Sequence, residues 1–304
     1  MTKIYIDGSS GTTGLRIHER LKDLPELEIL SLPPELRKDT PSRAAILREA
    51  DIALLCLPDN AAVEAAELAG ENTVLIDTST AHRTAEGWVY GFPELYGKRE
   101  QITAGKRIAN PGCHASGFIS LVEPLVREGL IASDTELSCF SVTGYSGGGK
   151  AMIGEYESEN RPEEFSAPRQ YALGQNHKHL KEMRQISHLL HEPVFCPVVA
   201  DYYSGMAVTV PLFQKELKGT AEDIKELYKA CYHSDIVHYE ELTEGMIAGN
   251  RVAGRDDMQI FVGGNSERIL LISVFDNLGK GASGAAIQNM NILLGLDERT
   301  GLVL

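Results

Sequence analysis

Cysteine and long apolar runs are both scarce in this 304-residue sequence. Its five cysteines are an odd number and include no CxxC pair, so neither a disulfide framework nor a structural zinc site is expected. No apolar run approaches the roughly 18 residues of a membrane span, and the stretch MTKIYIDGSS lacks the apolar segment of a secretory signal. We therefore expect a cytoplasmic protein with no membrane partner and no metal site.

Positive charge is also in short supply. Lys and Arg number 29 against 43 Asp and Glu, which gives a net charge of −14. That balance argues against nucleic acid or an anionic membrane surface as the main partner. It does not exclude a small anionic substrate, which needs only a local basic pocket. The length suggests two domains, or one domain with a large insertion.

The first third of the chain alternates short strand and helix patterns. Continuous apolar strands between helices predict a parallel sheet covered on both faces, as in a Rossmann-type α/β domain. The expected strands are 3–7, 27–32, 51–58 and 73–79, and the expected helices are 15–21, 44–50 and 60–69.

The rest of the chain has a different pattern. Long, β-branched and partly alternating stretches at 135–146, 193–213 and 268–275 predict an α+β domain with a mainly antiparallel sheet. A helix is expected at 221–232. The small-residue-rich segment 281–296 predicts a helix that packs back on the first domain. We place the first domain at 1–113 together with about 282–304, and the second at 114–281.

The segment GSSGTTG places Gly8, Gly11 and Gly14 between an expected strand and a helix. Glycines there let the backbone turn tightly and approach a pyrophosphate, which the helix N-terminus then stabilises. The spacing departs from GxGxxG, so a purely structural turn stays open as an alternative.

The end of the second strand, SLPPELRKD, carries Ser31 and then Arg37 and Lys38. An acidic residue at this position typically binds the ribose 2′-hydroxyl of NAD. Its absence, with a basic pair nearby, favours NADP over NAD. A solvated basic turn is the alternative.

The segment NPGCHASGFI places Cys113 directly after Pro-Gly, at the start of an expected helix over 115–126. The N–H groups of a helix N-terminus lower the pKa of a thiol, and a thiolate can attack a carbonyl or an acyl phosphate. Cys113 is therefore the candidate nucleophile. Core packing is the interpretation for the other four, of which three lie in apolar strands and one on a helix: Cys56, Cys139, Cys196 and Cys231.

A thiolate nucleophile needs a group that handles protons. The segment NHKHLKEM supplies His177 and His179, which would share one face of an extended segment, and Glu182, which can reach back to His179 if a helix begins there. We favour His179 as the acid/base and Glu182 as the residue that orients it, with His177 in reserve. Metal binding and two ordinary surface histidines are the alternatives.

Two further loops suggest a site for an anionic substrate. GYSGGGK, residues 144–150, is a second glycine-rich loop that follows a strand and ends in Lys150. DTSTAHR, residues 77–83, follows a strand whose end faces the ligand cleft of a doubly wound sheet. Either loop can also be purely structural.

Taken together, these segments resemble the shorter form of the N-acetyl-gamma-glutamyl-phosphate reductases, which belong to the aspartate-semialdehyde dehydrogenase-like superfamily. YGFPEL and DNLGKGASGAAIQNMN add to the resemblance, which runs nearly end to end. It implies a Rossmann NADP domain, a catalytic domain, and reduction of an acyl phosphate in arginine biosynthesis through a Cys113 thioester. The longer form usually has an aromatic residue after the cysteine, where this chain has His114.

The resemblance also implies binding residues and a homo-oligomer, either dimer or tetramer. The residues assigned to the cofactor are Gly8, Ser10, Gly11, Thr12, Thr13, Gly14, Ser31, Arg37, Lys38, Pro58, Ser79 and Gly281. Those assigned to the anionic acyl-phosphate substrate are Arg83, Asn110, Ser146, Gly147 and Lys150. A related semialdehyde or phosphate-using aldehyde dehydrogenase, and a non-catalytic dinucleotide sensor, remain the alternatives.

Overall fold

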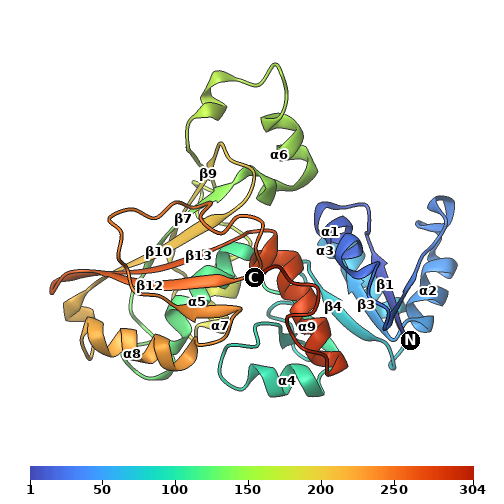
Figure 1. Ribbon diagram of the computed structural model, residues 1–304, viewed down its shortest axis with the longest axis horizontal. Helices are drawn as coiled ribbons and strands as arrows, with labels where there is room; N and C mark the ends of the chain where they lie inside the picture. Colours follow the sequence, from blue (N-terminus) through green and yellow to red (C-terminus); the bar gives the residue numbers. More distant parts are fainter. The chain divides into compact units, whose positions relative to one another are not determined.

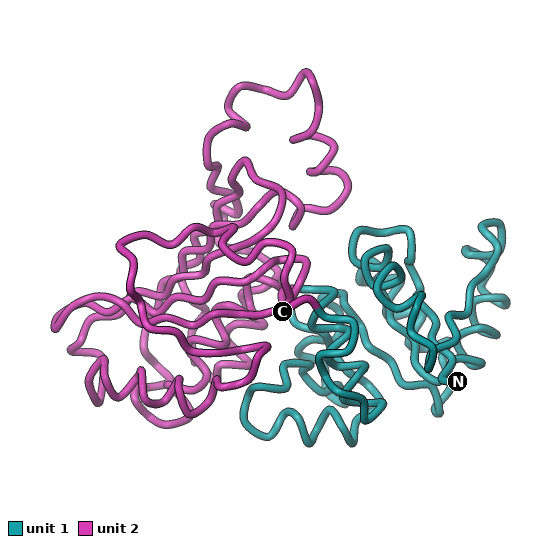
Figure 2. The backbone as a smooth tube through the Cα atoms, in the orientation of Figure 1, with its two compact units in different colours: residues 1–112, 282–302 teal, residues 113–281, 303–304 magenta.

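The computed structural model describes residues 1–304, which form two compact units. The first unit contains residues 1–112 and 282–302, and the second contains 113–281 and 303–304 (Figure 2). The chain therefore crosses from the first unit to the second directly before Cys113. It crosses back directly after Gly281.

The first unit is built on a six-stranded parallel sheet with the order β2-β1-β3-β4-β6-β5 (Figure 1). Its strands are β1 Thr2–Asp7, β2 Leu27–Leu30, β3 Ile52–Leu55, β4 Val74–Asp77, β5 Val89–Tyr90 and β6 Arg107–Ala109. Its helices are α1 Thr12–Leu21, α2 Thr40–Glu49, α3 Asp59–Leu68, α4 Lys98–Ala104 and α9 Gly284–Leu294.

Both faces of this sheet carry a hydrophobic core. On one face Ile4 and Ile6 pack with Ile17 of α1 and with Ile287 of α9. On the other face β-strand side chains pack with residues of α2 and α3, such as Leu47. Since alternate side chains of a strand point to opposite faces, two covered faces require the continuous apolar strands seen in the sequence.

The second unit is built on a seven-stranded mixed sheet with the order β11-β12-β13-β10-β7-β9-β8. Four of its neighbouring pairs are antiparallel, and only β11 with β12 and β7 with β9 are parallel. The strands are β7 Ser138–Gly144, β8 Arg169–Gln170, β9 Val194–Ala200, β10 Met206–Phe213, β11 Val237–Tyr239, β12 Met258–Gly264 and β13 Arg268–Phe275. The expected fold class is confirmed.

The central helix of the second unit is α5 Cys113–Arg127, which contacts β10, β13, α7 Leu180–Ile186 and α8 Ala221–Cys231. Every residue from 114 to 125 is buried, as expected for a helix enclosed on all sides. Helix α6 Gly149–Tyr156 lies in a lobe that projects from the sheet (Figure 1). No helix is both long and apolar enough to span a membrane.

Three of the expected strands are shorter in the structure. The strands expected at 27–32, 51–58 and 73–79 end at Leu30, Leu55 and Asp77. Cys56 therefore lies just beyond β3 rather than inside a strand. Its carbonyl oxygen faces the turn after β1, where the expected nucleotide-binding loop begins.

Candidate active site

The candidate nucleophile Cys113 is the first residue of α5 and is partly buried. Asn110-Pro111-Gly112 precedes it, so the thiol lies at the end of the helix where the N–H groups point outward. A Cβ atom at Gly281 would lie 2.9 Å from the Cβ of Cys113. Only glycine therefore fits at position 281 without displacing the nucleophile.

A buried carboxylate holds the Gly281 turn in place. Asp276, at the end of β13, accepts hydrogen bonds from the backbone N–H groups of Leu278 at 2.7 Å and Gly279 at 3.0 Å. Its second oxygen accepts from the hydroxyl of Ser204 at 2.8 Å and from the N–H of Gly254. Its backbone carbonyl accepts from the N–H of Gly281 at 3.0 Å.

Three histidine rings meet in the second unit. The ring of His114 lies 5.7 Å from that of His177 and 5.5 Å from that of His179, centroid to centroid. The rings of His177 and His179 are 4.8 Å apart. Phe195 of β9 packs edge-on against His114 and His177. The structure thus brings both predicted histidines to the residue that follows Cys113.

His114 is buried and bonded at both ring nitrogens. Its Nδ1 lies 2.6 Å from the hydroxyl of Ser141, and its Nε2 lies 2.7 Å from the hydroxyl of Tyr171. Burial, with smaller contributions from the charges of His177 and Lys178, lowers the pKa of His114 to about 3. The ring is therefore neutral at pH 7 and has one donor and one acceptor nitrogen.

His177 and His179 lie in a turn, and the expectation of an extended segment is wrong. His179 has helical dihedrals and is the N-cap residue of α7. Its backbone N–H donates to Nδ1 of His177 at 3.3 Å, which a straight strand does not allow. Burial, with a smaller contribution from Lys178, lowers the pKa of His177 to about 4. Glu182 lies in the first turn of α7, and both it and His179 are buried.

Arg83 and Asn110 lie in the first unit and fix its loops. Arg83 is buried, and its guanidinium donates to the backbone carbonyls of Asn110 and Thr78, each at 3.0 Å. The side-chain amide of Asn110 donates to the carbonyl of Ala282 at 3.0 Å, and its oxygen accepts from Asn289 at 3.3 Å. Both side chains therefore hold the strand end that leads into Cys113.

The glycine-rich loop after β7 forms a 3₁₀ turn over Tyr145–Gly148 and then enters α6. Ser146 is buried, and its hydroxyl accepts from the side-chain amide of Asn277 at 3.0 Å. Gly147 has room for a side chain, since a Cβ there would be 3.5 Å from Asn277. Lys150 is exposed on α6.

The predicted nucleotide loop connects β1 to α1. Gly8 has a φ of +87°, and a Cβ there would lie 2.2 Å from the carbonyl oxygen of Cys56. Ser10 lies in the turn, Gly11 is the N-cap residue of α1, and the first turn of the helix contains Thr12, Thr13 and Gly14. The glycine thus brings the backbone close to β3 at a helix N-terminus, as a pyrophosphate site requires.

Two other predicted cofactor residues lie on neighbouring elements of the same sheet. Pro58 is the N-cap residue of α3. Ser79, after β4, is buried and donates from its hydroxyl to Asp77 at 2.7 Å. The same carboxylate bonds Nδ1 of His82, whose ring stacks on Trp88.

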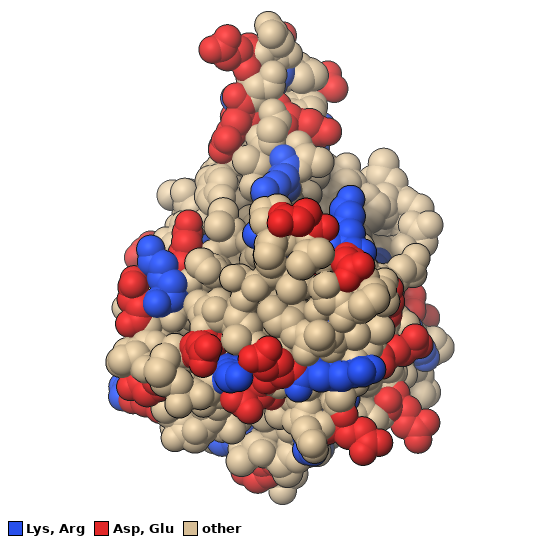
Figure 3. All heavy atoms as spheres, turned by 90° about the vertical axis from the view of Figure 1, so that its right-hand side faces the viewer, with Lys and Arg blue, Asp and Glu red and all other residues tan.

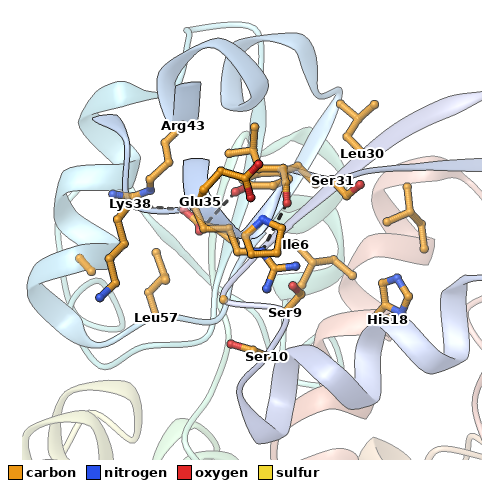
Figure 4. Close-up of a pocket in the computed structure, with 18 of the residues that line it drawn as sticks. Ile6, Ser9, Ser10, His18, Leu30, Ser31, Glu35, Lys38, Arg43 and Leu57 are labelled. Carbon is orange, nitrogen blue, oxygen red and sulfur yellow. Dashed lines mark hydrogen bonds and ion pairs between the residues drawn. The ribbon is translucent and has the colours of Figure 1, made fainter. Parts of the chain in front are cut away.

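A pocket of about 690 Å³ opens beside the nucleotide loop (Figure 4). Its lining includes Ser9, Ser10, His18, Ser31, Arg37 and Lys38. Within it the buried Arg43 bridges Asp7 at 3.0 Å and Glu64 at 3.1 Å. On the face shown in Figure 3, basic side chains are interspersed with acidic ones and form no extended basic surface.

Burial disfavours the thiolate at three of the other cysteines. Burial raises the pKa of Cys56 to about 12 and also raises that of Cys139. Burial raises the pKa of Cys231 despite the nearby Arg127. A thiol with a raised pKa is a poor nucleophile at neutral pH. The chain has no group of three or more His, Cys, Asp or Glu placed to hold a metal ion.

Sequence reasoning missed several residues that the structure places at these sites. His114 was noted only as a departure from a family pattern, and a polar residue at a buried helix position was the available signal. Tyr171 and Ser141 lie 57 and 27 residues from His114 and gave no signal. Asp7 lies at the end of β1. The search for an acidic residue covered only the end of the second strand, so Asp7 was missed.

Residues 3–104 match the family described as "Semialdehyde dehydrogenase, NAD binding domain", and residues 113–277 match "Semialdehyde dehydrogenase, dimerisation domain". The chain is 41% identical to N-acetyl-gamma-glutamyl-phosphate reductase 2 of Nostoc sp., covering 99% of both chains. It is 44% identical to N-acetyl-gamma-glutamyl-phosphate reductase of Brucella ovis, covering 96% of this chain and 99% of the relative.

Two solved structures share the fold at low sequence identity. Aspartate semialdehyde dehydrogenase II of Vibrio cholerae, complexed with ASA, has a TM-score of 0.72 at 18% identity, covering 97% of this chain and 98% of that one. Aspartate semialdehyde dehydrogenase of Candida albicans, solved with NADP, has a TM-score of 0.68 at 16% identity, with the same coverage.

Proposed function

The chain belongs to the N-acetyl-gamma-glutamyl-phosphate reductase family, and from that premise we propose how it reduces N-acetyl-gamma-glutamyl phosphate to N-acetylglutamate semialdehyde. The reaction releases phosphate and is a step of arginine biosynthesis. The observation that carries the proposal is the partly buried Cys113 at the N-terminus of α5, next to a cluster of histidines.

Cys113 acts as the nucleophile. Its thiolate attacks the acyl carbon, and the bond from that carbon to the phosphate oxygen breaks. Phosphate departs, and the acyl group remains bound to the sulfur as a thioester. Bound NADPH supplies the hydride for reduction of the thioester carbonyl. The oxyanion that forms on the Cys113-bound carbon takes a proton and becomes a hydroxyl group. When this hydroxyl later loses its proton, the carbon–sulfur bond breaks. The aldehyde then departs and the thiolate is restored.

His179 gives and removes this proton, and Glu182 orients its ring. The geometry supports this choice because Nδ1 of His177 already accepts the backbone N–H of His179. His177 is therefore committed at one nitrogen and suits a hydrogen-bonding role toward the substrate. His179 and Glu182 are both buried at the start of α7, where water does not compete for the proton.

The first unit, residues 1–112 with 282–302, binds NADP, and the second unit, which begins at Cys113, supplies the catalytic residues. Gly8 supports this because its positive φ and the nearby backbone carbonyl of Cys56 exclude a side chain, which allows the tight turn that a pyrophosphate-binding loop needs before its helix. Arg43 is already balanced by Asp7 and Glu64, which leaves Arg37 and Lys38 as the cations for the 2′-phosphate. The same unit would contribute Ser31, Pro58 and Ser79, and the turn before α9 would contribute Gly281.

The substrate's negative charge requires donors near the thiol. We assign Arg83, Asn110 and the loop residues Ser146, Gly147 and Lys150 to this task. The buried position of Arg83 supports a role in fixing the Asn110 loop, so its contribution to binding is through that loop. The exposed Lys150 suits a contact with the phosphate group.

A homodimer that works in the cytoplasm completes the proposal. One face of the second sheet presents apolar side chains that are more than a third exposed: Phe140, Val194, Phe213 and Leu270. They lie on adjacent strands of the sheet, and the match to a dimerisation domain covers them. A second copy of the chain would bury this face. Phe140→Asp should lower the mass in analytical ultracentrifugation, whereas Tyr96→Asp, on the first unit, should not.

The direct test runs the reaction backwards. N-acetylglutamate semialdehyde, NADP and phosphate should give phosphate-dependent NADPH formation at 340 nm, and arsenate should replace phosphate. Aspartate semialdehyde in the same assay distinguishes the related dehydrogenase. No turnover with either aldehyde, together with tight NADP binding, would favour a sensor and contradict the proposal.

A further inference from the structure

A chain of short hydrogen bonds links β7 to the segment that carries the histidines. The hydroxyl of Ser141 lies 2.6 Å from Nδ1 of His114, and Nε2 of His114 lies 2.7 Å from the hydroxyl of Tyr171. Ser141 is fully buried and His114 nearly so. All three groups lie in the second unit, and His114 directly follows Cys113 in the sequence.

The tautomer of His114 sets the direction of this chain. A neutral ring has one donor and one acceptor nitrogen, so the chain can run either way between Ser141 and Tyr171. When Nδ1 accepts from the Ser141 hydroxyl, the proton of the ring is on Nε2. Nε2–H then donates to the oxygen of Tyr171. The hydroxyl proton of Tyr171 is consequently directed away from His114 and toward another acceptor.

The hydroxyl of Tyr171 lies 2.7 Å from Nε2 of His114, the residue that directly follows Cys113. Burial raises the pKa of Tyr171, and negative charge on the Cys113 sulfur raises it further. The phenol therefore keeps its proton at neutral pH and stays a donor. The other titratable groups around the cluster are His177, His179 and Lys178.

The backbone that carries Tyr171 is held in a strained conformation. Ala172 and Gln175 have φ values of +52° and +51°, which residues other than glycine rarely adopt. The side chain of Gln175 donates to the carbonyl of Phe195 at 2.7 Å and accepts from its N–H at 2.9 Å. Such strain persists only where the surrounding structure enforces it, and it is concentrated at functional sites.

We propose that Tyr171 is a further catalytic residue, whose hydroxyl donates a hydrogen bond to the oxygen of the acyl group on Cys113, and that His114 is the positioning residue that aims it. The proposal deepens the acyl-enzyme mechanism and rests on it for the natural substrate. The hydrogen bond strengthens as the carbonyl oxygen gains negative charge. No proton is transferred by Tyr171, so the proton balance through His179 is unchanged.

Two reactions of the same thiol separate this role from a structural one. p-Nitrophenyl acetate acylates a thiolate through an oxyanion and releases p-nitrophenolate, whereas iodoacetamide alkylates it by displacement of iodide without an oxyanion. Tyr171→Phe should slow acylation of Cys113 by roughly 10²-fold but change alkylation by less than about threefold. Cys113→Ser measures the background from the other thiols. Neither probe is the natural substrate, so the result stands whatever the semialdehyde assay gives.

Variants of His114 test whether this residue positions the hydroxyl of Tyr171. His114→Gln keeps a donor toward Tyr171 and should retain most of the acylation rate, whereas His114→Phe keeps only the ring shape and should lose as much as Tyr171→Phe. The double variant H114F/Y171F should be no slower than Y171F, since both changes remove one contact. Additive losses in the double variant would overturn the positioning role.

Nitrogen NMR of ¹⁵N-histidine-labelled protein, with the H114Q variant for assignment, reads the tautomer directly. The proposal requires protonated Nε2 and bare Nδ1 on His114 from pH 5 to 8. Protonated Nδ1 would point the hydroxyl of Tyr171 back to His114 and overturn the proposal. Equal slowing of acylation and alkylation in a folded Tyr171→Phe protein, or no slowing of either, would overturn it as well.

Discussion

The pocket beside the nucleotide loop and the histidine cluster at Cys113 differ in the charge of the groups that form them. The pocket is lined by formal charges, with Arg43 bound between two carboxylates and with Arg37 and Lys38 exposed. The cluster contains buried and half-buried groups joined by hydrogen bonds, and burial keeps His114 and His177 uncharged at pH 7.

The difference follows from what each region must bind. A phosphate group is negatively charged and pairs with cationic side chains. Cations that are exposed, such as Arg37 and Lys38, remain hydrated when no phosphate is bound. A thiolate that attacks an acyl carbon needs fixed dipoles with little water, since preorganised donors act most strongly where water is excluded. Substitutions in the pocket should therefore change the affinity for the cofactor, and substitutions in the cluster should change the rate of the reaction.

Removal of the nucleophile should have the largest effect. Cys113→Ser should reduce turnover by roughly 10⁴-fold or more while leaving NADPH affinity unchanged. One equivalent of iodoacetamide at pH 7 should label Cys113 first in the native protein, because burial raises the pKa of Cys56 to about 12 and also raises that of Cys139. Preferential labelling of Cys231 with activity retained in C113S would contradict the assignment.

The histidines come next. His179→Asn should lower kcat by roughly 10²–10⁴-fold if that ring handles the proton. His177→Asn should cost less and act mainly on KM, and Glu182→Gln should give an intermediate loss. The pH profile of kcat for each variant is the measurement. If His177→Asn removes the near-neutral limb while His179→Asn keeps it, the two roles are exchanged.

In the pocket, the change should appear as affinity rather than rate. The pair of substitutions Arg37→Ala and Lys38→Ala should weaken NADPH by about 1.5–3 kcal/mol per lost charge-assisted contact and affect NADH little. Titration of cofactor fluorescence gives both dissociation constants. Lys22→Ala, an exposed lysine beyond the end of α1, is the control and should change neither. Equal native affinities for NADPH and NADH would refute the preference.

The smallest effect concerns stability in acid. Folding lowers the pKa of His114 to about 3 and that of His177 to about 4, below the usual 6.5. The unfolded chain therefore binds more protons below pH 6.5, so this contribution is full above pH 6.5, declines as the pH falls below it, and is lost by about pH 4 for His177 and about pH 3 for His114. Each histidine contributes a slope of at most about 1.4 kcal/mol per pH unit. Urea unfolding from pH 7 to 4.5 should show a shallower slope for His114→Gln.

How far the sequence predicts this molecule differs between the two regions. The first sheet and the nucleotide loop follow from local patterns, because apolar strands, glycines and helix starts lie next to one another in the chain. The thiol at the start of α5 also follows from one local signal, Pro-Gly before Cys113. The family resemblance is confirmed by relatives of 41–44% identity.

The sequence predicted His177 and His179 but not their neighbours in the cluster, because those residues come from distant segments. Ser141 reaches His114 from β7, and Tyr171 reaches it through a backbone bent by two left-handed residues, Ala172 and Gln175. Neither residue type marks such a bend. The segment at His177 is a turn that leads into α7 instead of the extended stretch that the HxH spacing suggested. Asp7 and Arg43 were missed for a similar reason, since 36 residues separate them.

The carboxylate of Asp276 joins three separate segments behind the nucleophile: Ser204 before β10, Gly254 before β12, and the turn at 278–281. Opening that turn breaks several bonds to one fully buried group at once, so local fluctuations should not release it. The amide hydrogens of Leu278, Gly279 and Gly281 should accordingly exchange with deuterium only when the whole second unit unfolds. The segment beside Cys113, which includes the start of the π-helical turn Gly279–Ser283, would then open only as often as the whole unit unfolds.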